Sequence, residues 1–130
     1  MTHTSFLVPA LLFILAVSLA ACGGGASQAA PPPQVPVGDA AAGEKLFASA
    51  CAACHGLQGH GVPGLSQDMT QSARIAGTTD QELFEMIKTG RVPGDQSGTA
   101  EAVMPPKGGN PALTDQNLAD MVAYIRSLQK

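Results

Sequence analysis

The sequence predicts an all-α domain of three main helices joined by long loops. Three segments repeat apolar residues at helical spacing behind a capping residue, and no segment alternates polar and apolar residues as a strand does. The connecting segments are long and rich in Gly, Ser and Pro. Because long structureless loops are uncommon in a compact domain, their length indicates that this domain wraps around something large.

The first predicted helix opens at Asp39, which can act as its N-cap, and runs to about Ala50. Leu46 and Phe47 form its inward side. The stretch 55–78 follows as loop, with at most a short turn of helix.

The second helix opens with the capping box Thr79-x-x-Glu82, and Gly90 is placed to end it. Its apolar residues share one face: Leu83, Met86 and Ile87. After a second loop, 91–111, Thr114 caps the last helix, with Tyr124 at the edge of its apolar face. The residues of that face recur at helical spacing: Leu118, Met121, Val122, Ile125 and Leu128.

The N-terminal segment 1–21 is predicted to be a signal peptide. Its apolar run is too short and too close to the N-terminus for an ordinary spanning helix. Leu-Ala-Ala-Cys at 19–22 resembles the lipobox of bacterial lipoproteins, which implies that Cys22 is acylated and anchors the chain to a membrane. No Lys or Arg precedes Phe6, so an uncleaved anchor stays open, as does Cys22 as a chance thiol behind an ordinary cleaved signal. Each alternative puts the domain outside the cytoplasm, on the periplasmic or cell-surface side.

Residues 22–38 are predicted to be the lipidated cysteine and a tether rich in Gly and Pro, and residues 39–130 the folded domain. Such a tether lets a domain swing between partners at a membrane surface. The net charge of −3 excludes a nucleic-acid binder on electrostatic grounds.

The decisive motif is Cys51-Ala-Ala-Cys54-His55, the Cys-x-x-Cys-His pattern of haem c attachment. Two thiols three positions apart can each add to one vinyl group of a porphyrin, and the adjacent His presents its ring to the iron. The other ring nitrogen should donate to a backbone carbonyl, and Pro63 lies at a suitable separation to provide it.

Other readings of this motif fit less well. A thioredoxin-like pair needs a strand before Cys51, and a zinc site needs four ligands, with only His60 left to add. A disulfide between Cys51 and Cys54 would leave the long loops unexplained.

The sixth iron ligand is a choice among methionines. Met86 and Met121 lie on apolar helix faces and fit core packing, and Met69 is close to His55 in the sequence. Met104 lies in the second long loop, where the two following prolines stiffen the backbone. It is the preferred ligand, and a thioether there would raise the reduction potential.

Further residues carry a family pattern. Gly43 and Phe47 precede Cys51, and Met121 and Tyr124 stand on the last predicted helix. In these positions and in the haem motif, the span 39–130 resembles the class I cytochromes c. The resemblance implies that the first and last helices cross closely at the glycine.

Two loops add to this resemblance. The run Met-Pro-Pro-Lys-Gly-Gly at 104–109 looks like the Met-Pro loop of short bacterial members, and 56–64 resembles the loop after the haem motif. The family implies the small all-α cytochrome fold around one covalent haem c, with His–Met ligation and electron transfer.

We therefore expect a mono-haem carrier of single electrons and not an enzyme. With His55 and Met104 on the iron, no small-molecule substrate can bind there, and the partners are redox proteins in small, short-lived contacts. Arg74 is either a partner of a haem propionate or a solvated charge, and Lys107 is a weaker alternative ligand. The partner surface is expected at loop residues near the haem edge: Ala52, Ala53, Val62, Val103 and Pro105.

Two other functions stay open. The chain can be a tethered haem subunit of an oxidase or dehydrogenase complex, with the same chemistry and a permanent partner. If Met104 is not bound to iron, an open site would give peroxidase-like or gas-binding behaviour.

Overall fold

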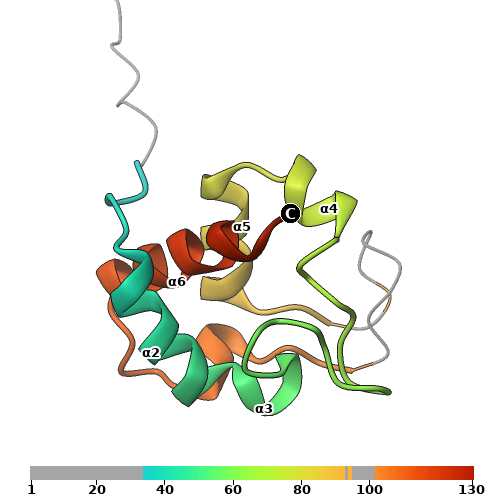
Figure 1. The fold of residues 1–130 in the computed structure, drawn as a ribbon. Coiled ribbons are helices and arrows are strands. Elements are labelled where there is room, and N and C mark those ends of the chain that lie inside the picture. Colours follow the sequence, from blue (N-terminus) through green and yellow to red (C-terminus); the bar gives the residue numbers. More distant parts are fainter. Residues whose placement is uncertain (1–33, 93, 95–101) are drawn as a thin grey trace, which may run out of the picture. The chain divides into compact units, whose positions relative to one another are not determined.

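The computed structural model describes residues 34–92, 94 and 102–130 of the chain (Figure 1). The predicted signal peptide, Cys22 and most of the predicted tether lie outside the described residues. The described elements are α2 (Ala40–Ala50), α3 (Ala52–His55), α4 (Ala73–Gly77), α5 (Asp80–Thr89), the 3₁₀ helix η1 (Pro106–Gly109) and α6 (Asp115–Leu128). Within these residues there are two isolated β-bridges and no strand, so the all-α fold is confirmed.

The three main helices begin at their predicted caps. The Asp39 carboxylate accepts hydrogen bonds from the first-turn amides of α2, and α5 opens with the predicted capping box of Thr79 and Glu82. Thr114 forms a second capping box with Asn117 at the start of α6. These side chains satisfy amides that have no partner within the helix, which fixes where each helix starts.

The first and last main helices cross closely, as the resemblance implied. α2 and α6 lie side by side in Figure 1, and Gly43 sits at their contact. A Cβ on Gly43 would stand 1.9 Å from the carbonyl oxygen of Asp120. Beside this contact, the rings of Phe47 and Tyr124 pack with their centroids 5.3 Å apart.

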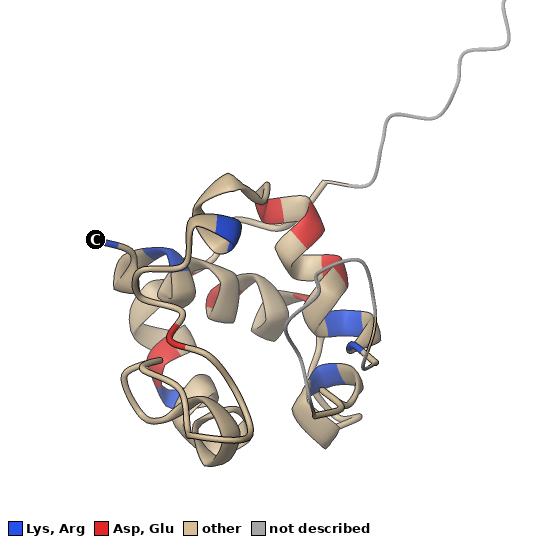
Figure 2. Cartoon of the chain, turned by 90° about the vertical axis from the view of Figure 1, so that its right-hand side faces the viewer, with Lys and Arg blue, Asp and Glu red and all other residues tan. Residues whose placement is uncertain are grey.

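α5 is tied to α6 through ion pairs. Lys88 Nζ lies 3.0 Å from Asp115, and Arg126 Nε lies 2.7 Å from Asp80. Figure 2 shows the acidic residues of α5 in its first turns and a basic residue near its end, which matches the direction of the helix dipole. Arg126 also donates to the carbonyls of Ile75 and Thr78, so it joins α6 to the end of α4.

Contacts with the core and with α6 begin before Asp39, within the segment predicted as tether. Val35 packs against the core, and the Val37 carbonyl accepts a hydrogen bond of 2.9 Å from the Gln116 side chain. A Cβ on Gly38 would stand 2.1 Å from the carbonyl oxygen of Ala119. These backbone contacts with α6 are long-range, and the composition of the segment does not indicate them.

None of the helices in the described part of the chain has the length and hydropathy needed to span a bilayer.

Candidate functional site

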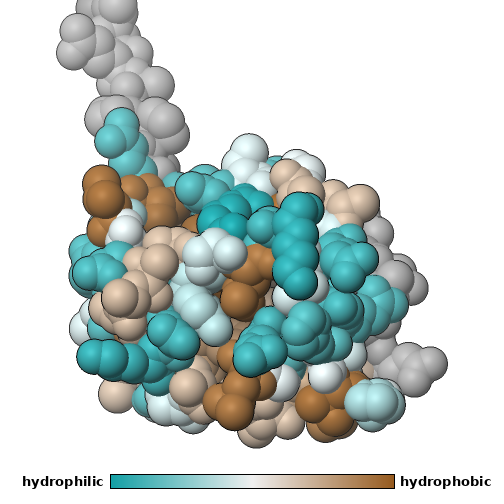
Figure 3. All heavy atoms as spheres, in the orientation of Figure 1, coloured by the Kyte–Doolittle hydropathy of each residue, from teal (hydrophilic) through white to brown (hydrophobic). Residues whose placement is uncertain are grey.

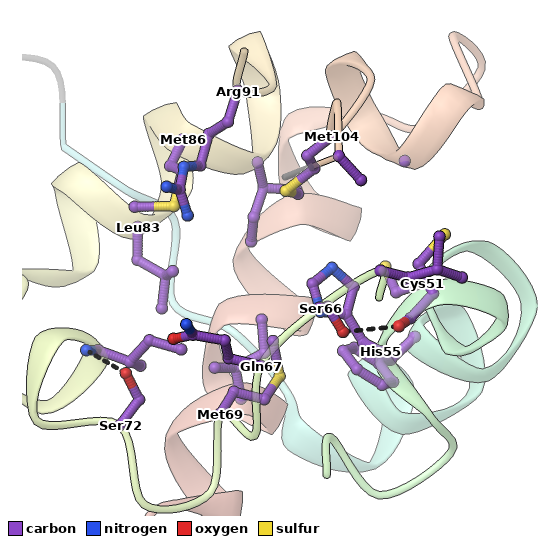
Figure 4. Close-up of a pocket in the computed structure, with 18 of the residues that line it drawn as sticks. Cys51, His55, Ser66, Gln67, Met69, Ser72, Leu83, Met86, Arg91 and Met104 are labelled. Atoms are coloured by element: carbon purple, nitrogen blue, oxygen red, sulfur yellow. Dashed lines mark hydrogen bonds between the residues drawn. The ribbon is translucent and has the colours of Figure 1, made fainter. Parts of the chain in front are cut away.

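A largely apolar cavity of about 330 Å³ lies between α3, α5 and the segment around Met104 (Figure 4). The loop 65–69 and the start of α4 complete its wall. The predicted long loops therefore enclose a space, which is what their length and composition indicated.

The haem motif folds as one turn at the junction of two helices. Cys51 is both the C-cap of α2 and the N-cap of α3. The His55 amide donates a hydrogen bond of 3.0 Å to the Cys51 carbonyl. Gly56, with a φ of 72°, then ends α3. Cys51, Cys54 and His55 all line the cavity, so the structure brings the three predicted residues together.

The two cysteines of the motif are not joined in a disulfide. Cys51 is half-buried with its Sγ 3.7 Å from the Met121 sulfur, whereas Cys54 is exposed. Burial, with the neighbouring Cys54 adding to it, raises the pKa of the Cys51 thiol to about 11. The Cys51 sulfur therefore keeps the protonated thiol form that adds to a vinyl group.

The His55 ring is suited to bind a metal. Its ring centroid lies 6.3 Å from that of Phe47, and its buried Nδ1 has no hydrogen-bond partner. Burial, and to a lesser degree the charge of Arg91, lower the pKa of His55, so the ring is neutral at pH 7. A neutral imidazole in the lining of an apolar cavity fits a haem and its iron.

The predicted hydrogen bond from His55 to the Pro63 carbonyl is not formed. The Nδ1 atom has no partner, and the loop is instead held by the Gly61 amide, which donates to the His55 carbonyl at 2.8 Å. A β-bridge between Val62 and Ser66 closes the same loop. These backbone bonds fix the turn around Pro63 without using its carbonyl to orient the ring.

Met104 lies across the cavity from His55 (Figure 4). Its amide donates to the Arg91 carbonyl at 2.9 Å, and the Arg91 amide donates to the Met104 carbonyl at 2.8 Å. This bridge fastens the Met104 segment to the end of α5, next to Gly90. Pro105 follows in an extended conformation with φ −68°.

The methionines other than Met104 lie in the core or beside it. Met121 is fully buried in the core, as expected. Met86 packs against the core, also as expected, and both Met86 and the buried Met69 line the cavity as well. One face of α5 packs on α6 at one edge and borders the cavity at the other, so helical periodicity alone could not separate the two roles.

Polar side chains also line the cavity, among them Gln67, Ser72, Arg74 and Arg91. Arg91 was not singled out from the sequence, because nothing local connects it with Met104. His60 is an exposed loop residue whose Nδ1 is 3.4 Å from Asp68, as expected. The Lys107 amine donates to the Leu113 carbonyl at 2.7 Å.

Comparison with known proteins finds one family among both the family models and the relatives. The family model described as "Cytochrome c" matches residues 40–129. A cytochrome c-555 of Chlorobaculum thiosulfatiphilum is 34% identical over 87 residues, covering 67% of this chain and 93% of that protein. A cytochrome c4 of Azotobacter vinelandii is 34% identical over 93 residues, covering 69% of this chain and 41% of that protein.

Two further similarities bear on function and fold. A cytochrome bc1 complex cytochrome c subunit of Mycobacterium tuberculosis is 28% identical over 120 residues, covering 88% of this chain and 39% of the relative. The solved structure of the KustC0563 c-type cytochrome covers 68% of this chain and 98% of its own, with a TM-score of 0.50 and 25% identity. The residues that the family model matches, 40–129, run from α2 to α6.

Proposed function

The chain belongs to the cytochrome c family, and we propose that it carries single electrons between extracytoplasmic redox proteins by outer-sphere transfer. As a member of that family it carries covalent haem c. We assign the thioether bonds to Cys51 and Cys54, and the axial positions of the iron to His55 and Met104. The observation that carries this assignment is their placement around one apolar cavity, with His55 and Met104 on opposite sides.

When bound, haem c supplies an iron that changes oxidation state by one electron. The protein's residues hold and shield it. Leu83 and Ile87 exclude water from the cavity, His55 stays neutral and ready to ligate, and the Arg91 bridge holds Met104 in place. Because both axial positions are filled by side chains, no substrate can bind the metal, and we infer that the protein is a carrier and not an enzyme.

The partner surface is proposed where the cavity wall reaches solvent. Cys54 is exposed, and Leu65 and Val103 line the cavity while remaining 47% and 62% exposed. Figure 3 shows apolar residues interrupting a polar surface in separate patches, as small transient contacts require. Single electrons would pass through this edge without the partner entering the cavity.

The test is the optical spectrum of the haem-loaded protein, oxidised and reduced, with and without carbon monoxide. We expect a far-red Met-to-ferric-iron band and no carbon monoxide shift. Met104→Ala should lose the band and bind carbon monoxide, whereas Met86→Leu, which changes another sulfur of the same cavity, should keep the wild-type spectrum. A wild-type protein that binds carbon monoxide readily would overturn the carrier function and favour the open-site alternative.

A second candidate is a haem subunit of a respiratory complex. The mycobacterial relative is named as the cytochrome c subunit of a bc1 complex and matches 88% of this chain. Co-purification of the chain with a membrane complex after mild detergent extraction would support this role. Recovery of the chain alone would favour a free carrier.

The membrane anchor is proposed at Cys22. We expect the mature chain to begin there, carry lipid and stay with the membrane fraction, while Cys22→Ala releases a soluble haem protein. Mass spectrometry of the mature N-terminus checks this directly, and an unmodified N-terminus at another residue would contradict it.

A further inference from the structure

The segment that follows Met104 folds back on itself before α6 begins. The Gly108 amide donates to the Pro105 carbonyl at 3.1 Å, within the turn of η1. The Leu113 amide then donates to the Asn110 carbonyl at 3.2 Å, next to the N-cap of α6. Residues 105–113 therefore join the proposed iron ligand to the last helix, and we call them the ligand loop.

Lys107 closes the ligand loop through both its backbone and its side chain. Its carbonyl accepts a hydrogen bond of 3.1 Å from the Asn110 amide. Its amine donates to the Leu113 carbonyl at 2.7 Å and, at 3.5 Å, to the Pro111 carbonyl. The contact with Leu113 is partly buried, and a charged donor makes a stronger hydrogen bond than a neutral one. The Lys107 side chain thus ties the start of the loop to its last residue.

The backbone of Lys107 is strained. Its φ is 54° and its ψ is 31°, and among the described residues it alone has a positive φ without being a glycine. A residue with a Cβ rarely adopts this left-handed conformation. Such strain persists where surrounding contacts fix it, and the hydrogen bonds of the Lys107 amine and carbonyl are contacts of this kind. The strain therefore points to a role for Lys107 in setting the shape of the loop.

The shape of the ligand loop matters because the loop touches both sides of the haem site. Its 3₁₀ helix η1 contacts α2 as well as α5. A Cβ on Gly108 would stand 2.8 Å from the carbonyl oxygen of Ala50, the residue before Cys51. Among the described residues, Pro105 and Gly108 line the cavity and Lys107 does not. Lys107 can therefore act on the cavity only through the loop.

We propose that Lys107 is a positioning residue: its amine clamps the ligand loop, and the clamped loop keeps Met104 on the iron. This inference rests on the proposed function. Before the loop, Met104 is held by two backbone hydrogen bonds with Arg91, of 2.8 and 2.9 Å. After it, the Lys107 amine holds the chain against the start of α6. Without the amine, the loop moves away from the cavity more often and takes the thioether with it.

The decisive variants are Lys107→Leu and Lys107→Arg in the haem-loaded protein. Lys107→Leu removes the amine and keeps a Cβ on the strained backbone, whereas Lys107→Arg keeps a charged donor for the same carbonyls. The main readout is the rate at which carbon monoxide associates with the reduced protein, because carbon monoxide binds only when Met104 has left the iron.

We expect a clear difference between these two variants. The loss of one charged hydrogen bond corresponds to about a tenfold change in an opening equilibrium. Lys107→Leu should therefore bind carbon monoxide about tenfold faster than the wild type and show a weaker far-red band. Lys107→Arg should stay close to the wild type in both measurements.

Two controls separate the amine contact from backbone strain and from charge. Lys107→Gly relieves the left-handed backbone and also removes the amine. It should resist urea better than Lys107→Leu and still bind carbon monoxide faster than the wild type. Lys45→Leu removes an exposed lysine of α2, and it should leave the carbon monoxide rate and the far-red band unchanged.

Failure of this inference is distinguishable from failure of the proposed function. Wild-type carbon monoxide rates and far-red bands in both Lys107→Leu and Lys107→Gly would overturn the role of Lys107, even if their stability in urea fell, because Lys107 would then support only the fold. That result leaves the electron-transfer function standing. A wild-type chain that attaches no haem c, or that binds carbon monoxide readily, contradicts the proposed function and this inference together.

Discussion

Gly90 is the residue on which the placement of Met104 depends most. Its φ is 75°, in a region that residues with a side chain rarely adopt. A Cβ there would stand 2.4 Å from the Met104 carbonyl oxygen and 2.7 Å from the Pro106 nitrogen. The end of α5 and the Met104 segment approach closely only because this position carries no side chain.

Gly90→Ala should therefore weaken both the fold and the ligation. We expect the free energy of unfolding to fall by about 1–3 kcal/mol, with a weaker far-red band and faster carbon monoxide binding. Denaturant titration and optical spectra of the haem-loaded variant measure these effects.

Gly64→Ala is the matched control for this prediction. Gly64 has a similar φ of 78°, but nothing lies within 4 Å of its Cβ position. It should lose stability through its backbone conformation alone and keep the wild-type spectrum. Equal spectral changes in the two variants would show that the close approach at Gly90 does not matter.

At the scale of elements, the crossing of α2 and α6 sets the frame of the domain. Gly43 allows the two backbones to touch, and Phe47 and Tyr124 pack beside it. The buried Asp120 carboxylate accepts a hydrogen bond of 2.9 Å from the Asp39 amide, at the start of α2. Because α3 follows α2 directly, this crossing also places the haem motif.

Gly43→Ala should separate these helices. A Cβ 1.9 Å from the Asp120 carbonyl oxygen cannot be accommodated without moving one backbone, and overpacking of this kind costs about 1–3 kcal/mol. Gly77→Ala in α4 is the control, since its Cβ position is open, and its stability should change by less than about 0.5 kcal/mol. Urea denaturation of both variants measures this difference in stability. Equal denaturation midpoints for Gly43→Ala and Gly77→Ala would contradict a tight crossing of α2 and α6.

Arg126 joins α6 to the end of α4 and the start of α5. It donates to the Ile75 and Thr78 carbonyls and pairs with Asp80 at 2.7 Å. Arg126→Met keeps the length of the side chain and leaves those carbonyls without their donor, so we expect a loss of about 1–3 kcal/mol in unfolding free energy.

The exposed ion pair of Lys88 and Asp115 is the control for the contacts of Arg126. Lys88→Met should cost about 1 kcal/mol or less, as surface ion pairs usually do. Urea denaturation measures the unfolding free energy of both variants. A larger loss in Lys88→Met than in Arg126→Met would show that Arg126 is only a surface residue.

At the scale of the whole molecule, the domain surrounds a cavity, and leaving that cavity empty would cost stability. A cavity of about 330 Å³, at about 24 cal/mol per Å³, corresponds to about 8 kcal/mol. That is comparable with the entire stability of a small domain, about 5–15 kcal/mol. The haem therefore completes the core as well as carrying the electron.

Loss of haem attachment should accordingly unfold the domain. We expect the double variant Cys51→Ser with Cys54→Ser to show a shallow, non-cooperative thermal transition and reduced helical circular dichroism. Cys54→Ser alone retains one attachment point and should keep a cooperative transition at lower temperature. A double variant that unfolds as sharply as the wild type would contradict a structural role for haem.

Local features of the fold were readable from the sequence. Capping residues such as Thr79 and Thr114, and apolar residues at helical spacing, act within one or two turns, so they predict α5 and α6 well. The haem motif is equally local. Met104 was singled out as the expected ligand because the prolines that follow it are neighbours in the sequence.

Features made by distant contacts were not readable. The packing of Val35 and the bridge between Arg91 and Met104 each depend on how separate elements meet. The composition around Val35 indicated a tether and gave no sign of this contact. The Pro63 bond failed for a related reason, since sequence separation does not fix where a carbonyl points.

The position of Cys51 between α2 and α3 carries a consequence for biosynthesis. Its sulfur is half-buried against the sulfur of Met121, which belongs to α6. An enzyme that joins haem to this sulfur needs access from outside, which the finished packing of α6 reduces. Attachment at Cys51 should therefore come before α6 docks, so that the cofactor is installed on an open chain and the final helix then closes over the bond.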